Sequence, residues 1–256
     1  MSDFAVTRIT HSCHLIEIAG ATVLTDPWFS QKPGYHPGEP IAVTVPELPH
    51  LDAILISHRH YDHCDLDALD ALRDKTTPII CCRTVAKAAR AHGFSTVTVL
   101  AQWEQTTVGA LTITAAPAAH QVEEITFVVQ GAGHTVYFAG DTTFIPELRE
   151  LPLRFPAIDL ALVPTNGLRL RPLLNKKVVM DAQDAADLVA LLQPRVAIPH
   201  HYAFTSGPIG DRILTKSDRD PAAFARAAVG TSPGVDVRIL EPGERADLAI
   251  AAPPGS

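Results

Sequence analysis

The sequence reads Ser57-His58-Arg59-His60-Tyr61-Asp62-His63 directly after an apolar run, residues 51–56. At the end of a strand, residues two apart point the same way, so His58 and His60 can offer their imidazoles to one ion. Asp62 and His63 lie where the chain is expected to curl into a helix, and there they would face a second ion. The spacing therefore predicts metal ligands at the mouth of a buried strand.

Imidazole and carboxylate together suit zinc, manganese or iron, and an incomplete set of protein ligands leaves room for water. The alternative is a hydrated polar loop that happens to carry histidines. Four potential ligands within six positions, directly after a buried-looking strand, favour the metal site over that alternative.

The composition describes a soluble globular protein, because 46% of the 256 residues are hydrophobic and 19% are charged. A chain of this length can bury a sizeable core and forms one large domain or two small ones. The formal net charge is -7, and no segment concentrates lysine and arginine on the scale that a nucleic-acid groove needs. We therefore expect a small-molecule substrate and no nucleic-acid partner, and the oligomeric state stays open.

The chain carries no sign of export or membrane insertion. Its first residues, Met1-Ser2-Asp3-Phe4, lack the basic, apolar and small-residue order of a signal peptide. No apolar run reaches the length that crosses a bilayer. The cysteines have neither disulfide-framework nor zinc-ribbon spacing; they are Cys13, Cys64, Cys81 and Cys82. A cytoplasmic location is the simplest expectation.

Hydrophobic periodicity and turn residues divide the chain into two blocks with one plan, each with antiparallel strands first and strand-helix units after. The predicted strands are 4–9, 13–18, 21–25, 53–56, 78–81, 97–100, 105–108, 111–115, 125–130, 135–139, 160–163, 196–198 and 235–240. The predicted helices are 65–74, 84–92, 181–192 and 221–229.

Two mixed sheets packed face to face, with helices outside, accommodate this plan within a single domain, residues 1–256. The active site would lie at the edge where strand ends from both halves meet. Residues 30–49 are rich in proline and glycine, which indicates a surface excursion or a lid. The tail, residues 251–256, is expected to fray.

Further ligand candidates follow predicted strands downstream, namely His120, Asp141, His200 and His201. A lone histidine near a strand end is more often an ordinary hydrogen-bonded residue. Together, and in this order, the four reinforce one another as metal ligands.

With these residues in place, the sequence resembles the metallo-β-lactamase fold superfamily of metal-dependent hydrolases. The superfamily's H-x-H-x-D-H signature is matched by His58, His60, Asp62 and His63. Later family positions are matched by His120, by Asp141 within Gly140-Asp141-Thr142, and by a histidine within Pro199-His200-His201-Tyr202. The resemblance spans most of the chain and implies an α+β fold, a four-layer αββα sandwich.

The resemblance also implies which residues share an ion. One ion is held by the residues that match His58, His60 and His120. The other is held by those that match Asp62, His63 and the last histidine, and the position of Asp141 bridges both. Relatives often read Pro-x-His before an aromatic residue, so His201 matches better than His200, which would be a supporting residue or only a neighbour.

A narrower resemblance is to the branch of L-ascorbate-6-phosphate lactonases and related uncharacterised hydrolases, and more remotely to N-acyl-phosphatidylethanolamine phospholipase D enzymes. Residues 10–17, 24–27 and 180–201 carry it. These marks indicate the branch and say almost nothing about the substrate.

The expected mechanism follows from the metals. Two cations about 3.5–4 Å apart can share a water and lower its pKa towards neutrality. The resulting hydroxide would attack a carbonyl carbon or phosphorus. Asp62 can orient it while binding a metal, and Asp141 between the ions partly neutralises their repulsion. His11, at another strand end, either faces the substrate or donates a proton to the leaving group, or else is a polar turn residue.

Several other residues have two interpretations. Asp26 either accepts a hydrogen bond from a ligand histidine or opens a turn before Pro27. Cys64 is more often a small apolar group than a thiolate ligand, and Asn166 either polarises a substrate oxygen or forms a turn. A basic cluster could attract an anionic substrate or be a solvated loop; it consists of Arg169, Arg171, Lys176 and Lys177.

The primary expectation is a hydrolase that uses two divalent metal ions, zinc first and manganese or iron as alternatives, to cleave a small ester, lactone or phosphoester. A diiron oxidoreductase on the same fold is the second hypothesis, although nothing in the sequence indicates a flavin module. A non-catalytic metal-binding protein is the third, and the intact ligand set argues against it.

Overall fold

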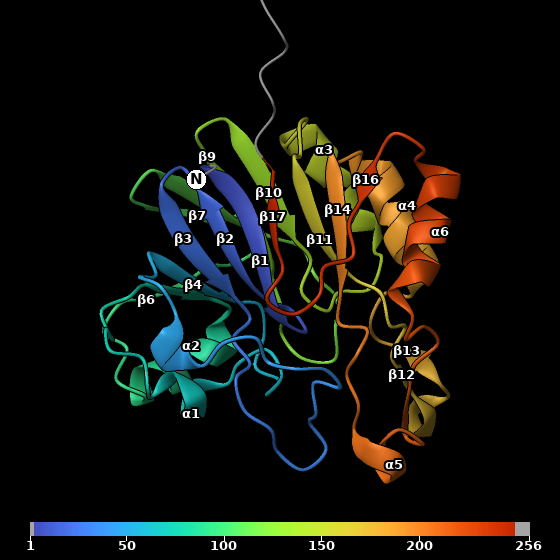
Figure 1. Cartoon of the computed structure of the whole chain (residues 1–256), viewed down its shortest axis with the longest axis horizontal. Coiled ribbons are helices and arrows are strands. Elements are labelled where there is room, and N and C mark those ends of the chain that lie inside the picture. The colour runs from blue at the N-terminus through green and yellow to red at the C-terminus, as the bar shows by residue number, and fades with distance from the viewer. Residues whose placement is uncertain (1–2, 249–256) are drawn as a thin grey trace, which may run out of the picture.

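Two seven-stranded sheets form the body of the protein (Figure 1). The computed structural model describes residues 3–248. The first sheet has the order β17-β1-β2-β3-β4-β5-β6. Its strands are β1 (Phe4–Thr10), β2 (Cys13–Ile18), β3 (Ala21–Thr25), β4 (Ala53–Ile56), β5 (Ile79–Cys81), β6 (Val97–Val99) and β17 (Arg245–Asp247).

The second sheet has the order β16-β14-β11-β10-β9-β8-β7. Its strands are β7 (Gln105–Val108), β8 (Leu111–Ala116), β9 (Thr126–Gly131), β10 (His134–Phe138), β11 (Leu160–Pro164), β14 (Val196–His200) and β16 (Asp236–Val237). A small third sheet consists of β12 (Arg169–Leu170), β13 (Lys176–Lys177) and β15 (Leu214–Thr215).

The helices are short. The α-helices are α1 (Leu66–Leu69), α2 (Arg83–Ala91), α3 (Leu151–Arg154), α4 (Ala182–Leu192), α5 (Gly207–Gly210) and α6 (Pro221–Thr231). Three 3₁₀ turns are η1 (Val45–Glu47), η2 (Pro146–Glu150) and η3 (Arg171–Leu173). Within residues 3–248, none of the helices combines the length and apolar character needed to cross a membrane.

The two-block plan is confirmed. In the first sheet β1, β2 and β3 pair antiparallel, and β3 to β6 pair parallel. In the second sheet β7 to β10 pair antiparallel, and β10, β11, β14 and β16 pair parallel. The exception is β17, which returns from the end of the second block to pair antiparallel with β1. Its three residues are too few to show a strand pattern in the sequence.

Alternating side chains hold the layers together. In β10, Val136 and Phe138 are buried between the two sheets, whereas Tyr137 joins the core beneath the helices. In β11, Leu162 is likewise buried between the two sheets, and Ala161 joins the core beneath the helices. Successive residues of a strand face opposite sides of the sheet, so one strand serves both cores.

The helices cover the outer faces of both sheets, as the sequence predicted. Helices α4 and α6 pack on each other and on β11 and β14, at the right of Figure 1. Helix α2 packs on β5 and β6 of the first sheet. The predicted four-layer αββα arrangement is therefore confirmed.

The predicted helix at 65–74 is wrong in length, because α1 is a single turn (Leu66–Leu69). The Lys75 ammonium donates to the carbonyl of Leu69 and so satisfies the helix end. Asp74 accepts from the backbone N–H of Thr76, which forms a turn that competes with the helix. The predicted helix at 84–92 is shifted by one residue, and the strand at 235–240 shortens to Asp236–Val237.

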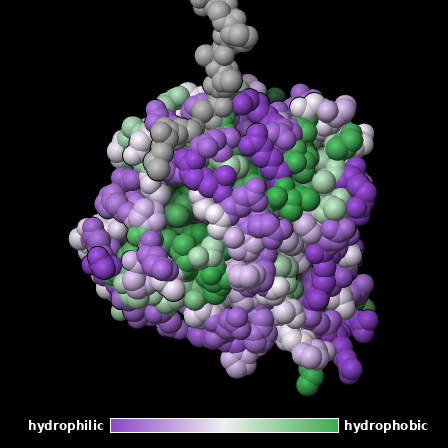
Figure 2. All heavy atoms as spheres, viewed as in Figure 1, coloured by the Kyte–Doolittle hydropathy of each residue, from purple (hydrophilic) through white to green (hydrophobic). Residues whose placement is uncertain are grey.

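Figure 2 shows that hydrophilic side chains cover most of this face and that hydrophobic ones gather in smaller patches between them. The exposed large hydrophobic residues within 3–248 are Val99, Leu153, Leu173, Leu174, Ile209, Ile213, Val229 and Ile239, of which only Leu173 and Leu174 are consecutive. The predicted frayed tail, residues 251–256, lies outside the described residues.

Candidate metal centre

Six strands bring chemically active residues to one edge of the sandwich. In the first sheet β1, β3 and β4 run in one direction, and in the second sheet β8, β10 and β14 do. Strands that run the same way place their carboxyl ends at the same edge. The residues that follow these ends are His11, Asp26, residues 57–63, His120, Asp141 and His201.

The first donor group consists of His58, His60 and His120. His58 Nε2 lies 3.0 Å from His60 Nδ1, and His120 Nε2 lies 3.1 Å from the same atom. Four ligands about 2.1 Å from a tetrahedral zinc lie about 3.4 Å apart, so three nitrogens at this spacing fit one divalent cation.

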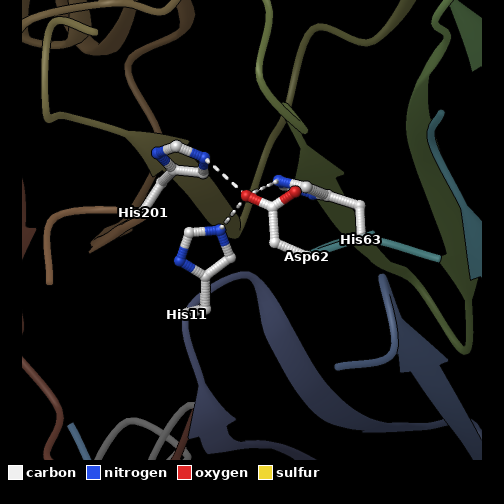
Figure 3. A group of neighbouring side chains, drawn as sticks. All are labelled: His11, Asp62, His63 and His201. Carbon is white, nitrogen blue, oxygen red and sulfur yellow. Dashed lines mark ion pairs between the residues drawn. The ribbon is translucent and has the colours of Figure 1, made fainter. Parts of the chain in front are cut away.

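The second donor group surrounds Asp62. His63 Nε2 and His201 Nε2 each lie 3.8 Å from Asp62 Oδ2. Asp141 Oδ2 lies 3.2 Å from His63 Nε2 and 2.9 Å from His201 Nε2. Figure 3 shows His63 and His201, together with His11, turned toward the Asp62 carboxylate.

The donor atoms of the second group fit a cation for a further reason. His63 Nε2, His201 Nε2 and Asp141 Oδ1 are buried and have no hydrogen-bond partner. A buried polar atom without a partner costs about 1–3 kcal/mol. A cation coordinated by these atoms would remove that cost, and nitrogen with carboxylate oxygen suits zinc, manganese or iron.

The electrostatic field of the site also favours positive charge. Burial alone would lower the pKa of His63, but Asp141, Asp62 and Asp26 outweigh burial and raise it well above its usual value. Burial alone would raise the pKa of Asp141, yet His201 and His63 hold it well below its usual value. The carboxylates that stabilise a proton on His63 would equally stabilise a divalent cation.

Two imidazoles of the first group, those of His58 and His60, are neutral at neutral pH. Burial, followed by the neighbouring His63 and His120, lowers the pKa of His58 well below its usual value. Burial, with His58 and His120 beside it, lowers the pKa of His60 to about 3. A neutral imidazole has a lone pair to donate, which a metal ligand needs.

Hydrogen bonds behind the donors orient their rings. His63 Nδ1 donates to Asp26 Oδ2 over 2.6 Å, and His120 Nδ1 donates to the carbonyl of Val178 over 2.8 Å. Asp26 also accepts from the backbone N–H and the hydroxyl of Ser57. Of the two interpretations of Asp26, the geometry supports contact with a candidate ligand, which leaves His63 Nε2 free for a cation.

Glu124 is a residue that the sequence analysis missed. Its Oε1 accepts from the backbone N–H of Asp141 over 2.6 Å and lies 3.4 Å from His58 Nδ1. Burial raises the pKa of Glu124 to about 8. Gly140 makes room for it, because a Cβ there would lie 2.4 Å from Glu124 Oε1. The signal that could have identified Glu124 in the sequence is an acidic residue directly before an apolar strand.

The two consecutive histidines after β14 face different surroundings. His201 has a left-handed backbone (φ 62°) that turns it toward Asp141. His200 instead places Nδ1 2.9 Å from the Ser12 hydroxyl and stacks on Phe138. The structure therefore brings His201, and not His200, next to Asp62, His63 and Asp141, and the role of His201 as a metal ligand stays a prediction.

His11 lies behind Asp62 and is fully buried. Its Nε2 is 3.4 Å from Asp62 Oδ2. Burial, followed by the neighbouring His201, lowers the pKa of His11 to about 3. It is not among the residues that line the adjacent cavity. The structure therefore places it at a turn within the donor cluster, away from the position expected of a residue that faces the substrate.

Three other sequence candidates do not join the site. Cys64 packs against the core, and burial raises the pKa of its thiol. The Asn166 side chain accepts from the backbone N–H of Leu168 in a turn. In the basic cluster, Lys177 pairs with Asp181 at 2.6 Å, so part of the cluster is neutralised locally.

A cavity of about 220 Å³ opens beside both donor groups. Its lining residues are Tyr35, His60, Asp62, His120, Gln121, Asp141, Leu168, Val179, His201, Phe204 and Leu214. The segment 30–49, predicted as a surface excursion, contributes Tyr35 to the cavity wall. Backbone hydrogen bonds between the neighbouring His36 and Thr205 attach this segment to the chain that follows β14. Donors from both sheets thus form one face of a small pocket.

Two mixed sheets with histidine and aspartate donors along a shared edge define the metallo-β-lactamase fold. Residues 21–202 match the family model described as the beta-lactamase superfamily domain. The protein belongs to this superfamily.

Known relatives agree with this placement. A UPF0173 metal-dependent hydrolase from Thermococcus kodakarensis is 30% identical over 251 residues, covering 95% of this chain and 99% of that protein. The structure of Igni18, a metallo hydrolase from Ignicoccus hospitalis, aligns with a TM-score of 0.73 and 22% identity over 95% of this chain and 97% of that chain.

CmlA, a diiron β-hydroxylase from Streptomyces venezuelae, aligns with a TM-score of 0.76 and 18% identity. The alignment covers 97% of this chain and 55% of that one. At this identity the likeness concerns the fold. The narrower resemblance to L-ascorbate-6-phosphate lactonases stays a prediction.

Replacing Asp26 tests its role behind His63. Asp26→Asn weakens the acceptor of the His63 Nδ1 proton, so we expect zinc affinity to fall about 10–100-fold in a chelator competition. Asp65→Asn is the control, since Asp65 is equally buried and binds Phe29, Ser30 and Ala68 rather than a candidate ligand. An equal loss in both variants would contradict this role.

The choice between the last two histidines is tested by metal content. His201→Ala removes a donor beside Asp141, and we expect it to lower the amount of zinc retained after dialysis. His200→Ala removes a ring that contacts Ser12 and Phe138, and we expect it to retain zinc. A greater loss in His200→Ala would reverse the assignment.

Proposed function

We propose that the protein is a metal-dependent hydrolase that binds two divalent cations and cleaves small, uncharged esters or lactones. One observation carries the proposal, namely that two donor groups meet at the floor of a single small cavity. The relatives described as metal-dependent hydrolases support it.

Each donor group would hold one cation. The first cation would be held by His58, His60 and His120, the second by Asp62, His63 and His201, and Asp141 would lie between them. When bound, the cations supply a water acidified towards neutral pH and positive charge for the oxygen that becomes negative during attack.

The carboxylates of the chain itself would orient the attacking water. Asp62 and Asp141 both line the cavity. Burial alone would raise the pKa of Asp62, but His63 and His11 hold it below its usual value, so Asp62 is ionised at neutral pH. Asp62 can therefore accept a hydrogen bond from the attacking water and orient it.

The cavity wall favours an uncharged substrate. Leu168, Val179, Phe204 and Leu214 form its apolar side, and none of its lining residues is lysine or arginine. Lys216 lies nearby, 4.6 Å above the Phe204 ring, but its ammonium is paired with Asp211. Apart from the two cations themselves, a phosphate group would find no lysine or arginine among the lining residues, so the proposal favours a carbonyl ester or lactone over a phosphoester.

The size of the cavity limits the substrate further. Its volume of about 220 Å³ falls below the roughly 300–1,000 Å³ that is usual for sites of drug-sized ligands. Gln121 and Tyr35 are the polar lining residues outside the donor groups, and they can hydrogen-bond a neutral oxygen. A short acyl chain or a small lactone ring fits these limits.

Removing a donor tests the metal-dependent reaction. We expect His60→Ala and Asp141→Ala to abolish hydrolysis and to keep the wild-type circular dichroism, because both residues lie beyond strand ends. His92→Ala is a matched control, since His92 is a partly exposed histidine at the end of α2 that bonds Asp70 and belongs to neither donor group. Wild-type turnover in either donor variant would contradict the assignment.

The metal content and activity of the purified protein distinguish a hydrolase from a diiron oxidoreductase and from a non-catalytic binding protein. Elemental analysis of protein purified without added metal should find about two equivalents of zinc or manganese together with hydrolysis. Iron with an oxygen-dependent reaction would favour a diiron oxidoreductase. Bound metal without turnover of any ester, lactone or phosphoester would favour a binding protein.

Placing a cation in the cavity wall tests the substrate class. Leu214 is partly exposed in the lining, so Leu214→Lys can accommodate its new charge. We expect the ratio of kcat/KM for phosphoesters over neutral esters to rise about tenfold, equivalent to about 1.4 kcal/mol. Leu153→Lys, at an 82% exposed position on α3, should leave the ratio unchanged. A wild-type preference for phosphoesters would contradict the proposed class.

A further inference from the structure

We propose that His11 is an additional ligand in the second donor group, so that Asp62, His63, His201 and His11 hold one cation together. This inference rests on the proposed metal centre and goes beyond it. The superfamily signature does not include His11, which comes from the turn after β1 at the opposite end of the sequence from His201.

The first argument is the surroundings of the His11 ring. The side chain is fully buried beside Trp28, Phe204 and His201, with ring centroids 4.8, 5.9 and 4.1 Å away. Neither ring nitrogen has a hydrogen-bond partner. A buried imidazole with neither nitrogen hydrogen-bonded costs free energy unless another group binds one of its nitrogens.

The second argument is distance. His11 Nε2 lies 3.4 Å from Asp62 Oδ2, without the alignment of a hydrogen bond. The donor atoms of His11, Asp62, His63 and His201 all lie within 4.8 Å of one another. Ligands of one tetrahedral zinc lie about 3.4 Å apart, so His11 Nε2 has the spacing of a ligand rather than of a bystander. Figure 3 shows its ring directed at the same carboxylate oxygen as His63 and His201.

The third argument is that the backbone holds His11 in place. The residue has a left-handed conformation (φ 49°), which is strained for a residue other than glycine. Its N–H donates to Glu39 Oε1 over 2.7 Å, and the buried Arg8 guanidinium pairs with the same carboxylate at 2.6 Å. These contacts maintain the strained turn that aims the ring at Asp62.

His14 provides an internal comparison. It lies three residues further on, is equally buried and also has an unpartnered Nε2. Its ring faces Phe138 and His200, and its Nδ1 contacts the carbonyl of Ser12. Among the described residues, His14 belongs to none of the donor groups that could hold a cation. Burial of a histidine alone therefore does not explain the position of His11.

The assignment makes the two cation sites unequal. The second would have three imidazoles and a carboxylate of its own, whereas the first would have three imidazoles. His60 and His120, in the first group, are also only partly buried. We expect the cation of the first group to leave first in a chelator titration and that of the second group to leave last.

The test compares His11→Gln and His11→Ala with His14→Gln. Zinc-loaded protein is titrated with a chelator, and the visible spectrum of the cobalt-substituted protein is recorded. We expect both His11 variants to lose the tighter equivalent, with affinity falling by more than the roughly 10–100-fold that loss of an outer partner costs. We expect their cobalt bands to change in position and intensity, because a nitrogen ligand is lost. His14→Gln should resemble wild type in both measurements.

Three results would overturn the assignment. Wild-type affinity and spectrum in the His11 variants would make His11 a packing residue. Retained affinity in His11→Gln with loss in His11→Ala would indicate hydrogen bonding to Asp62 instead of coordination. An equal loss in His14→Gln would indicate a general effect of disturbing the turn.

Failure of the proposed function gives a separate result. Wild-type protein that binds no divalent cation would remove the metal centre itself. Wild-type protein that binds two cations, with His11 variants that bind them equally well, would remove only the role of His11.

Discussion

The site depends on buried negative charge at the edge where the two sheets meet. Asp62 and Asp141 approach the same imidazoles, and Asp26 lies directly behind His63. Carboxylates this close and this buried need compensating positive charge, because burial of an unpaired charge is costly. The imidazoles supply part of that compensation, and in the proposed function divalent cations supply the remainder. This requirement links the donors of one sheet to those of the other.

The sandwich meets the requirement through strand direction. Neither block contains a complete donor set, since residues 57–63 belong to the first sheet and Asp141 and His201 follow strands of the second. The rigid cores on both sides of each sheet hold these strand ends in fixed positions. The loops that follow these strand ends have different roles. Some carry the donor residues, and others, such as residues 30–49, form the wall of the cavity.

Much of the site was predictable because its donors are concentrated in a short motif at a strand end. His58, His60, Asp62 and His63 are recognisable from spacing alone, and the two-block plan follows from hydrophobic periodicity. Glu124 was not predictable in this way. It reaches Asp141 across a gap of 17 residues, and the contact depends on the missing Cβ of Gly140. The three-stranded sheet was missed because strands of two residues leave almost no pattern.

The donor atoms and their positions after strands are readable from the sequence, because ligand chemistry and strand periodicity are local properties. Which donors face one another depends on how the two sheets pack. His60 and His120 are 60 residues apart in the chain, and their nitrogens lie 3.1 Å apart only because their strands end at the same edge. The tertiary structure likewise turned His201 rather than His200 toward Asp141, enclosed His11 behind Asp62 and built an apolar wall from distant loops. Each of these outcomes depends on packing between segments that have no local relation in the sequence.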